Sequence, residues 1–361
     1  MPKVLHIVDA DTSQDSLDQL ALLAGGSDRI VSVGRPPEYD QFPLLIQAVH
    51  CPLGLGQLGG WSIRGLAGQA DIIHTWSRKS ALAGRSLRVL TGKPVVLSWP
   101  SLPERKDMAL LTRLAGRWGI VLIVPTEIAQ TALGWAGAEK KSVHVLPPAA
   151  AAIEPERQVK RRREIREALG LSDNQFLLVA PAEMRAGAGH KYACWAHAIV
   201  RQIIDGVCLF MPSDGPNRQR VSFFAATTGY DEEILYREHL DQEREQALRK
   251  LDALAAADAA VFFGERDTGL SALVEAMAAG VAIAASNTPD VAECAPAGEV
   301  ALLSPCCDPR SASADVLRLV EDKELRKSLA TTAKDRATKF HSTDQCRQAL
   351  ASIYSSAATQ Q

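Results

Sequence analysis

Short apolar runs alternate with longer amphipathic stretches along the whole chain. Runs of four or five residues rich in Val, Ile and Leu predict strands that are buried on both faces, where apolar and polar positions do not alternate. The first half has such runs at 4–8, 30–33, 71–74, 94–98, 121–124 and 143–146, with predicted helices at 16–24, 80–90 and 109–118. This alternation of strand and helix predicts a parallel, doubly wound sheet.

The second half repeats the pattern after an interruption. Pro147, Pro148 and the alanine-rich and charged residues that follow predict a hinge over 149–162. Predicted strands then follow at 176–180, 207–211, 259–263 and 281–284, and predicted helices at 313–321, 324–334 and 344–355. The sequence therefore predicts two α/β domains, 1–148 and 163–338, and a terminal helical segment, 339–361.

Composition excludes several classes of protein. The chain has 361 residues, of which 47% are hydrophobic, and a formal net charge of −2, so no overall charge favours nucleic acid. Its apolar runs fall short of the about 18 residues that span a bilayer, and the first of them predicts a strand and not a signal peptide. Seven scattered cysteines lack the spacing of a metal site and predict thiols in a reducing, cytoplasmic compartment.

The clearest motif lies within 259–284. A predicted strand, 259–263, leads through a polar loop to Gly269 and a predicted helix, and the strand at 281–284 follows. Asp267 and Glu275 stand eight positions apart across the start of this helix. Because parallel sheets bind ligands outside the carboxyl ends of their strands, this loop is a candidate ligand site.

This segment resembles the nucleotide-sugar motif of the retaining, family 4 glycosyltransferases (glycosyl transferases group 1). In that family two glutamates bracket seven residues, and the pair here is Asp267 and Glu275, followed by the family-like sequences EAMAAG and PDVAE. The resemblance implies the GT-B fold, in which two Rossmann-like, doubly wound domains face each other across a cleft and the terminal helix returns to the first domain. It covers essentially the whole chain and is strongest from Arg163 onward.

The resemblance also implies an activity, namely transfer of a hexose from a nucleotide sugar to an acceptor with retention, without a metal or other cofactor. Asp267 is expected at the donor sugar and Glu275 at the ribose, which makes them the candidate catalytic residues. Thr268, Gly269 and Leu270 are expected at the diphosphate, where N–H groups at a helix start stabilise negative charge. The sugar, the base, the acceptor and the oligomeric state stay undetermined by the sequence.

Basic residues that the family places near the diphosphate are replaced here. With Gly189 aligned to the family's glycine, Glu183 and Ala188 occupy the positions of an arginine and a lysine. A carboxylate about 5 Å from a phosphate charge costs roughly 3 kcal/mol at an effective dielectric constant near 20. Arg185 and Lys191 either substitute for the missing cations or are ordinary surface residues. The remaining candidate donor-binding residues are Met184, Arg185 and Gly215.

The first domain departs from the family as well. Gln14 and Asp15 stand where two glycines are expected, and Trp76 and Pro100 stand where histidines are expected. The tryptophans Trp76 and Trp99 either line the cleft, where an aromatic face stacks on a sugar, or fill space left by lost polar groups. His74 fits a core position better than a functional one. The candidate residues on the acceptor side of the cleft are Gln14, Asp15, His74, Trp76 and Trp99.

Two further patterns match the spacing of a metal-binding pair and of a dinucleotide-binding motif. Asp9 and Asp11 have the spacing of a metal-binding pair after the first predicted strand, but a solvated loop explains them better. The glycines at 54, 56 and 59 match a dinucleotide fingerprint, yet Pro52 precedes them and no acid follows at the required distance. We interpret this segment as a structural glycine loop.

Basic residues concentrate in 78–117, where nine Lys or Arg accompany only two acids, Glu104 and Asp107. In this family such a surface docks on anionic membrane or meets an anionic acceptor, and the alternative is a solvated amphipathic helix face. Three functions stay open: the transferase, a catalytically impaired relative that binds a ligand or a partner protein, and a GT-B enzyme that acts on another substrate such as a sugar phosphate. The replacements at Asp15, Pro100, Glu183 and Ala188 favour the second.

Overall fold

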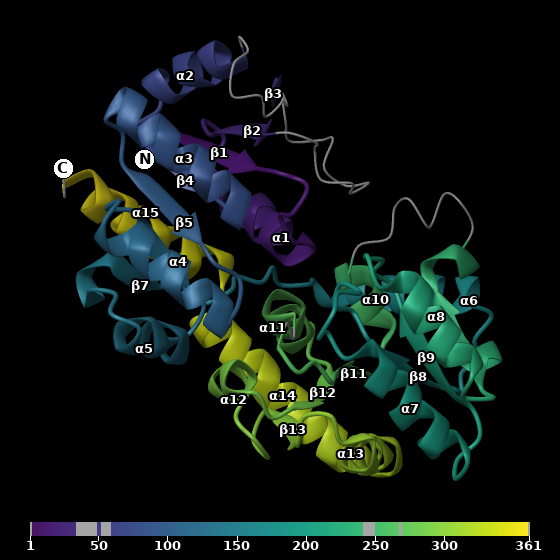
Figure 1. Cartoon of the computed structure of the whole chain (residues 1–361). Coiled ribbons are helices and arrows are strands. Elements are labelled where there is room, and N and C mark those ends of the chain that lie inside the picture. The colour runs from purple at the N-terminus through teal and green to yellow at the C-terminus, as the bar shows by residue number, and fades with distance from the viewer. Residues whose placement is uncertain (1, 34–48, 52–58, 241–249, 267–268, 360–361) are drawn as a thin grey trace. The chain divides into compact units, whose positions relative to one another are not determined.

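The computed structural model describes residues 2–33, 49–51, 59–240, 250–266 and 269–359. The chain divides into two compact units, the first made of Met1–Pro148 with Thr343–Gln361 and the second of Ala149–Ser342. Each unit is a parallel sheet flanked by helices (Figure 1). The predicted class, two doubly wound α/β sheets, is therefore confirmed.

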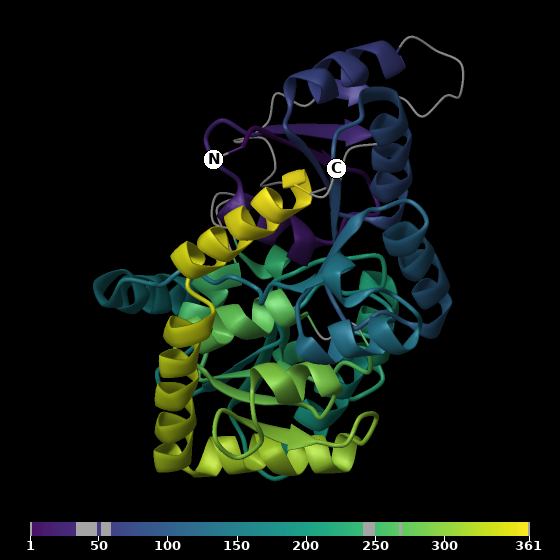
Figure 2. The ribbon, with the colours of Figure 1, turned by 90° about the vertical axis from the view of Figure 1, so that its left-hand side faces the viewer.

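The first unit contains a seven-stranded sheet in the order β3-β2-β1-β4-β5-β6-β7, and every neighbouring pair is parallel. The strands are β1 (Val4–Val8), β2 (Arg29–Val33), β3 (Val49–Cys51), β4 (Ile72–Thr75), β5 (Val95–Ser98), β6 (Val121–Val124) and β7 (Val143–Val145). The helices are α1 (Gln14–Leu23), α2 (Gly59–Gln69), α3 (Arg78–Thr91), α4 (Arg105–Gly116), α5 (Glu127–Trp135) and α15 (Thr343–Thr359), with a short 3-10 turn, η2 (Lys140–Ser142). Figure 2 shows α15 on one face of this sheet and α3 and α4 on the other.

Successive residues of the strands bury opposite faces of the first sheet. Leu5 and Ile7 of β1 join the core that α2 to α5 cover. Val8 packs instead with Leu17 and Leu20 of α1. Because both faces are covered, the strands consist mostly of apolar residues, which is the pattern that predicted them from the sequence.

The second unit contains a six-stranded parallel sheet in the order β10-β9-β8-β11-β12-β13. The strands are β8 (Phe176–Val179), β9 (Val207–Met211), β10 (Ile234–Tyr236), β11 (Ala259–Phe262), β12 (Ala282–Ser286) and β13 (Ala301–Ser304). The helices are α6 (Pro155–Ala168), α7 (His190–Arg201), α8 (Arg218–Ala226), α10 (Lys250–Ala256), α11 (Leu270–Ala278), α12 (Pro289–Cys294), α13 (Pro309–Glu321) and α14 (Lys323–Phe340), with 3-10 turns η3 (Asp231–Glu233) and η4 (Arg237–His239). The strand order reverses between β8 and β11, and such a reversal is where open α/β sheets bind ligands.

Two separate hydrophobic cores cover the second sheet. Leu177 and Val179 of β8 belong to the core that also contains residues of α6, α10, α11 and α14. Leu178 lies on the opposite face, in the core that includes residues of α7, α8 and α13. The sheet is thus held rigidly from both sides, and the loops at its carboxyl edge extend from fixed strand ends.

The predicted hinge over 149–162 differs from the structure in its second part. Helix α6 begins at Pro155, and proline is favoured in the first turn of a helix. Side chains of α6 anchor it to the second unit, because Arg162 contacts Asp258 at 2.6 Å and Arg161 contacts Asp252 at 3.2 Å. Hinge motion itself stays a prediction, restricted to the segment before α6.

Candidate functional site

Three loops meet at the carboxyl edge of the second sheet. They span 180–189 after β8, 212–217 after β9 and 263–269 after β11. The N–H group of Glu265 donates to the carbonyl of Gly187 at 2.7 Å, and the N–H group of Met184 donates to the carbonyl of Asp214 at 3.0 Å. The carbonyl of Met184 in turn accepts from the N–H group of Asn217 at 2.8 Å. Main-chain hydrogen bonds therefore join all three loops.

Two glycines allow these loops to approach so closely. A Cβ atom on Gly189, whose φ is +83°, would lie 2.0 Å from the carbonyl oxygen of Phe263. A Cβ atom on Gly215 would lie 2.7 Å from the carbonyl oxygen of Met184. No other residue fits either position without moving backbone. Gly215, a candidate from the sequence, is thus required by the close approach of the Met184 main chain. Met184 itself joins the loops through its main chain, while its side chain is buried in the core.

Helix α11 begins at the same edge of the sheet. Gly269 precedes its first residue in the left-handed conformation, with a φ of +67°. The first N–H groups of a helix have no partner inside the helix, so they are available to a ligand. Glu275 lies in the second turn of α11 and is only 6% exposed, which rules out a solvated helix face for this residue. Asp267 and Thr268 lie outside the described residues.

Glu183 and Arg185 form an ion pair at this edge. The Nε atom of Arg185 lies 2.7 Å from an Oε atom of Glu183, which is 7% exposed. The carboxylate that replaces the expected arginine therefore has its own counter-ion, and Arg185 keeps partial exposure. Ala188, at the position of the expected lysine, is 5% exposed. Lys191 is exposed, with its Nζ atom 4.5 Å from the ring centroid of Tyr192.

His190 and Tyr192 at the start of α7 also belong to this edge, although the sequence did not identify them. The Nε2–H group of His190 donates to the carbonyl of Ala182 at 3.0 Å, and burial lowers the pKa of His190 to about 4. The hydroxyl of Tyr192 donates to Glu265 at 3.1 Å. A hydrogen bond with Cys307, burial and Glu265 together raise the pKa of Tyr192. Both side chains are neutral at pH 7 and brace the loops.

The carboxyl edge of the first sheet is built differently. His74 is completely buried, and its Nδ1 atom lies 2.7 Å from the Tyr354 hydroxyl on α15 while its Nε2 atom lies 2.8 Å from the Ser98 hydroxyl. The Trp76 ring stacks on His74 with centroids 4.3 Å apart and is 4% exposed. His74 is thus a core residue, and Trp76 fills space in the unit. Trp99 is partly buried against the other core.

The loop after β1 differs from the prediction in two ways. Helix α1 begins at Gln14 with Ser13 as its N-cap, so Gln14 and Asp15 occupy its first turn. The Asp9 carboxylate is 2% exposed and accepts hydrogen bonds from Ser77 and from the N–H group of Asp11, so the predicted solvated loop is wrong for Asp9. Ser77 and the N-terminal turn of α3 lie close enough to bury it. The described part of the chain contains no cluster of His, Cys, Asp or Glu that could hold a metal.

The basic segment 78–117 forms α3, β5 and α4 with the loops that join them. Several of its cations have partners, since Lys79 contacts Asp11 at 2.8 Å and Arg85 lies 3.8 Å from the ring centroid of Trp118. Leu82, Val89 and Leu90 on α3 are exposed, Val89 to 79%. No helix among the described residues is long and apolar enough to cross a membrane. The segment 52–58, which contains most of the glycine pattern, lies outside the described residues.

Comparison with known proteins relates this architecture to glycosyltransferases. Residues 161–336 match the family model described as glycosyl transferases group 1. No curated protein matches the sequence. Among solved structures, HepE of Anabaena, crystallised with UDP and glucose, has 16% sequence identity and a TM-score of 0.80, with 98% of this chain and 100% of that chain covered.

Two further structures have the same fold. Sucrose-phosphate synthase of Thermosynechococcus elongatus is 14% identical with a TM-score of 0.75 and 100% coverage of both chains. A glycosyltransferase of Rickettsia africae is 13% identical with a TM-score of 0.73, covering 100% of this chain and 99% of that chain. The predicted GT-B fold is confirmed. Over residues 161–336, just under half of its length, the chain resembles the glycosyl transferases of group 1, and a glycosyltransferase activity is what this resemblance supports.

Proposed function

We propose that the protein transfers a hexose, with retention, from a nucleotide sugar bound at the carboxyl edge of the second sheet to an acceptor bound by the first unit. The observation that carries this proposal is the set of three interlocked loops beside the start of α11, at the reversal of strand order. This region lies inside the segment that matches the family model. HepE, which shares the fold, was also crystallised with UDP-glucose.

Different residues are expected to bind different parts of the nucleotide sugar. We assign the ribose to Glu275, the sugar to Asp267, and the diphosphate to the N–H groups that Thr268, Gly269 and Leu270 contribute around the start of α11. The assignment of Glu275 rests on its match to the second glutamate of the family motif and on its place in α11, inside the segment that matches the family model.

Arg185 is the cation that we assign to the diphosphate. Glu183 would compete with the phosphates for this guanidinium, and a carboxylate about 5 Å from a phosphate charge costs roughly 3 kcal/mol at an effective dielectric constant near 20. The ion pair reduces this cost by neutralising Glu183 with Arg185. Donor affinity therefore depends on how the guanidinium is shared between Glu183 and the phosphates.

Calorimetric titration with UDP, GDP, ADP and their glucose esters tests the donor site. We expect saturable binding of one nucleotide, and Glu183→Gln, which keeps the shape but removes the charge, is expected to tighten it about tenfold. Glu321→Gln, at an exposed position of α13, is the matched control and should change nothing. Absence of binding at millimolar nucleotide would refute the donor site, and an unchanged affinity of Glu183→Gln would remove Arg185 from it. Restoring a lysine at position 188 is not a suitable test, because Ala188 is buried.

The alternative is a catalytically impaired relative that binds a ligand or a partner protein. The buried Ala188 and the Glu183 carboxylate favour it, because both weaken stabilisation of a departing diphosphate. Donor turnover separates the two functions. An enzyme releases the nucleoside diphosphate from the donor in the presence of acceptor extracts or, slowly, of water, whereas the impaired relative binds the donor and leaves it intact.

We further propose that transfer needs no metal, so turnover should survive EDTA.

We also propose that the first unit contacts an anionic membrane from the cytoplasmic side. The exposed Leu82, Val89 and Leu90 lie on the same basic helix, α3, and apolar groups beside cations are what interfacial binding uses. Sedimentation with anionic vesicles should bring down the protein but not a Val89→Asp variant, while binding of neither protein would refute the membrane contact.

A further inference from the structure

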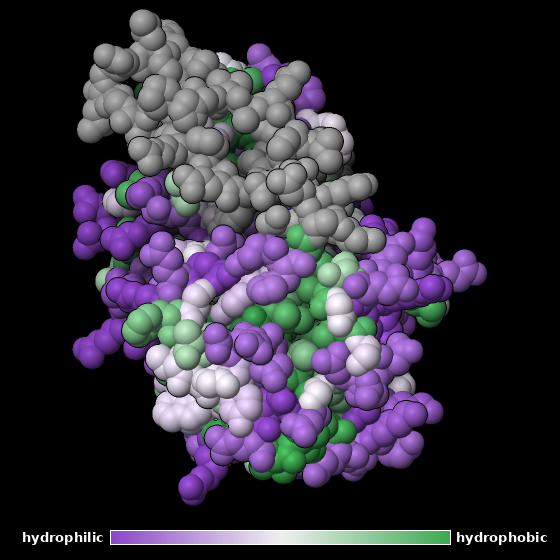
Figure 3. Space-filling model, turned by 90° about the vertical axis from the view of Figure 1, so that its right-hand side faces the viewer, coloured by the Kyte–Doolittle hydropathy of each residue, from purple (hydrophilic) through white to green (hydrophobic). Residues whose placement is uncertain are grey.

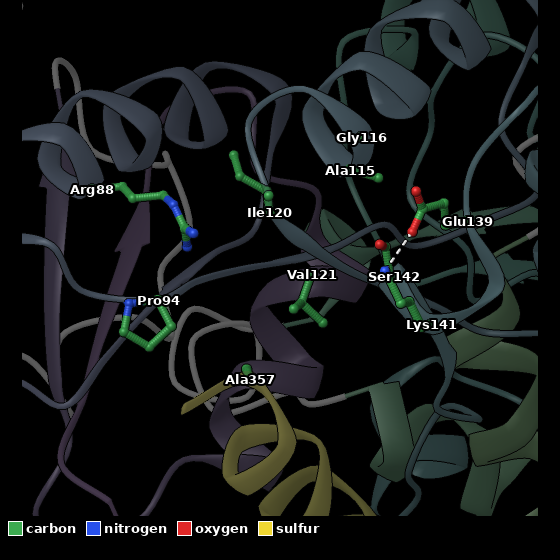
Figure 4. Close-up of a pocket in the computed structure, with 11 residues that line it drawn as sticks. Arg88, Pro94, Ala115, Gly116, Ile120, Val121, Glu139, Lys141, Ser142 and Ala357 are labelled. Atoms are coloured by element: carbon green, nitrogen blue, oxygen red, sulfur yellow. Dashed lines mark ion pairs between the residues drawn. The ribbon is translucent and has the colours of Figure 1, made fainter. Parts of the chain in front are cut away.

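A cavity lies at the amino edge of the first sheet, opposite the carboxyl edge described above. It occupies about 220 Å³ where β5, β6 and β7 begin, bounded by the ends of α3 and α4, by η2 and by the last turns of α15 (Figure 4). All of its lining residues belong to the first unit. The loops after β1, β4 and β5 leave the sheet at its other edge, so this cavity is separate from the acceptor side.

Arg88 supplies the main charge of the cavity. Figure 4 shows its side chain extending from α3 toward the hollow. Among the described residues none forms an ion pair or hydrogen bond with its guanidinium, although this side chain is partly buried. Gly119, with a φ of +58°, leaves room for it, because a Cβ atom there would lie 3.1 Å from an Nη atom of Arg88.

The opposite wall adds a second cation and a hydroxyl. Lys141 and Glu139 lie 2.9 Å apart as an ion pair, and Ser142 lines the cavity beside them. Two cations against one carboxylate leave a net positive charge. The floor is apolar, formed by buried residues such as Ile120 and Val121. A planar guanidinium and a hydroxyl that line the same cavity are groups that recognise oxyanions.

The size of the cavity limits the occupant. Sites for drug-sized ligands have about 300–1,000 Å³, so this one suits a smaller molecule than a nucleotide sugar. We propose that the cavity is a binding site for a small oxyanion, held by Arg88 and Ser142 and distinct from the transferase site. The carboxyl-terminal ends of α3 and α4 approach it, and their partial negative charge weighs against an anion. If Arg88 served only to offset these helix ends, its removal would lower stability and leave no anion binding to lose.

Titration with inorganic phosphate, followed by amide NMR at constant ionic strength with chloride as reference, tests the proposal on the full chain. We expect saturable shifts of the Gly116 and Gly119 amides, and in Arg88→Met an affinity weaker by about tenfold or more. Arg113→Met, which removes an exposed cation of α4 outside the cavity, is the matched control and should bind like the unmodified protein. Ser142→Ala, a change that leaves all charges in place, should weaken binding less than Arg88→Met.

A parallel titration with acetate distinguishes a phosphate site from a carboxylate site, and saturable binding of either anion at these amides supports the proposal. It is overturned if neither anion shifts them saturably, if Arg88→Met binds as tightly as the unmodified protein, or if the shifts are centred on another part of the chain. Anion binding in this cavity and nucleotide binding at the second sheet are measured on different residues. A negative result for the anion site therefore does not contradict the proposed nucleotide-sugar site.

Discussion

The carboxyl edges of the two sheets use different means to hold their shape. In the second unit, main-chain hydrogen bonds and two glycines fasten three loops to one another. In the first unit, buried side chains do so, with His74 between Tyr354 and Ser98 and Trp76 stacked against it. A main-chain framework leaves the side chains that face a ligand free to vary. The second edge can therefore keep its geometry even where Glu183 and Ala188 replace expected cations.

The largest effect is expected from Gly189→Ala in the main-chain framework. The added Cβ atom would overlap the Phe263 carbonyl, at 2.0 Å, and the positive φ adds strain, so we expect a loss of about 4 kcal/mol of unfolding free energy. Urea unfolding measures it. Gly170→Ala is the matched control, because its φ is +66° but nothing lies within 4 Å of the added atom, so only about 1–2 kcal/mol should be lost. Equal losses in the two variants would contradict close packing of the loops.

A smaller, pH-dependent effect is expected from His190. Its pKa is about 4 in the folded protein against 6.5 for an ordinary histidine, because burial disfavours the charged ring. The unfolded chain therefore takes up the proton first as the pH falls. The stabilising contribution is complete above pH 6.5 and is lost progressively toward pH 4, by about 3 kcal/mol in total.

The His190→Gln variant isolates this contribution, since its amide can still donate to the carbonyl of Ala182. Its unfolding free energy should fall less between pH 6.5 and pH 4 than that of the unmodified protein. The difference between the two curves carries the test, because other buried groups titrate in both proteins. Parallel curves would show that His190 does not brace the loop as a neutral ring.

The apolar runs made most of this fold predictable. Strands such as β6 and β11 are buried on both faces and stand out as uninterrupted Val, Leu, Ile, Ala and Phe. The short strands β3, β10 and β13 were not predicted. Strand β10, with three residues, follows an acidic 3-10 turn, and it is the sheet position beside β9 that makes it a strand. Pairing of this kind is a tertiary effect that a single sequence does not contain.

The candidate site was predictable only in outline. The glycines and the start of α11 follow from local sequence, and the structure places them together. Burial of Asp9, Glu183 and Trp76 does not follow, because each depends on a distant segment, such as Ser77 for Asp9. Polar residues after a strand are typical of solvated loops, and that general tendency misled the prediction for Asp9. The sequence also contained no signal for the bracing roles of His190 and Tyr192.

The smallest effect on unfolding free energy is expected from Tyr354→Phe, which tests the buried side chains at the carboxyl edge of the first sheet. Burial raises the pKa of Tyr354 and lowers that of His74, so the bond between them joins two neutral groups. Loss of the hydroxyl leaves a buried ring nitrogen without its partner, which costs about 2 kcal/mol.

Five of the six tryptophans lie in the first unit, so fluorescence reports its unfolding. In a double-mutant cycle with His74→Phe, the double variant should lose less than the two single losses together, because no unpaired nitrogen remains. Additive losses would mean that the two residues stabilise the unit only by packing, and the contrast between the two edges would then rest on the main-chain framework alone.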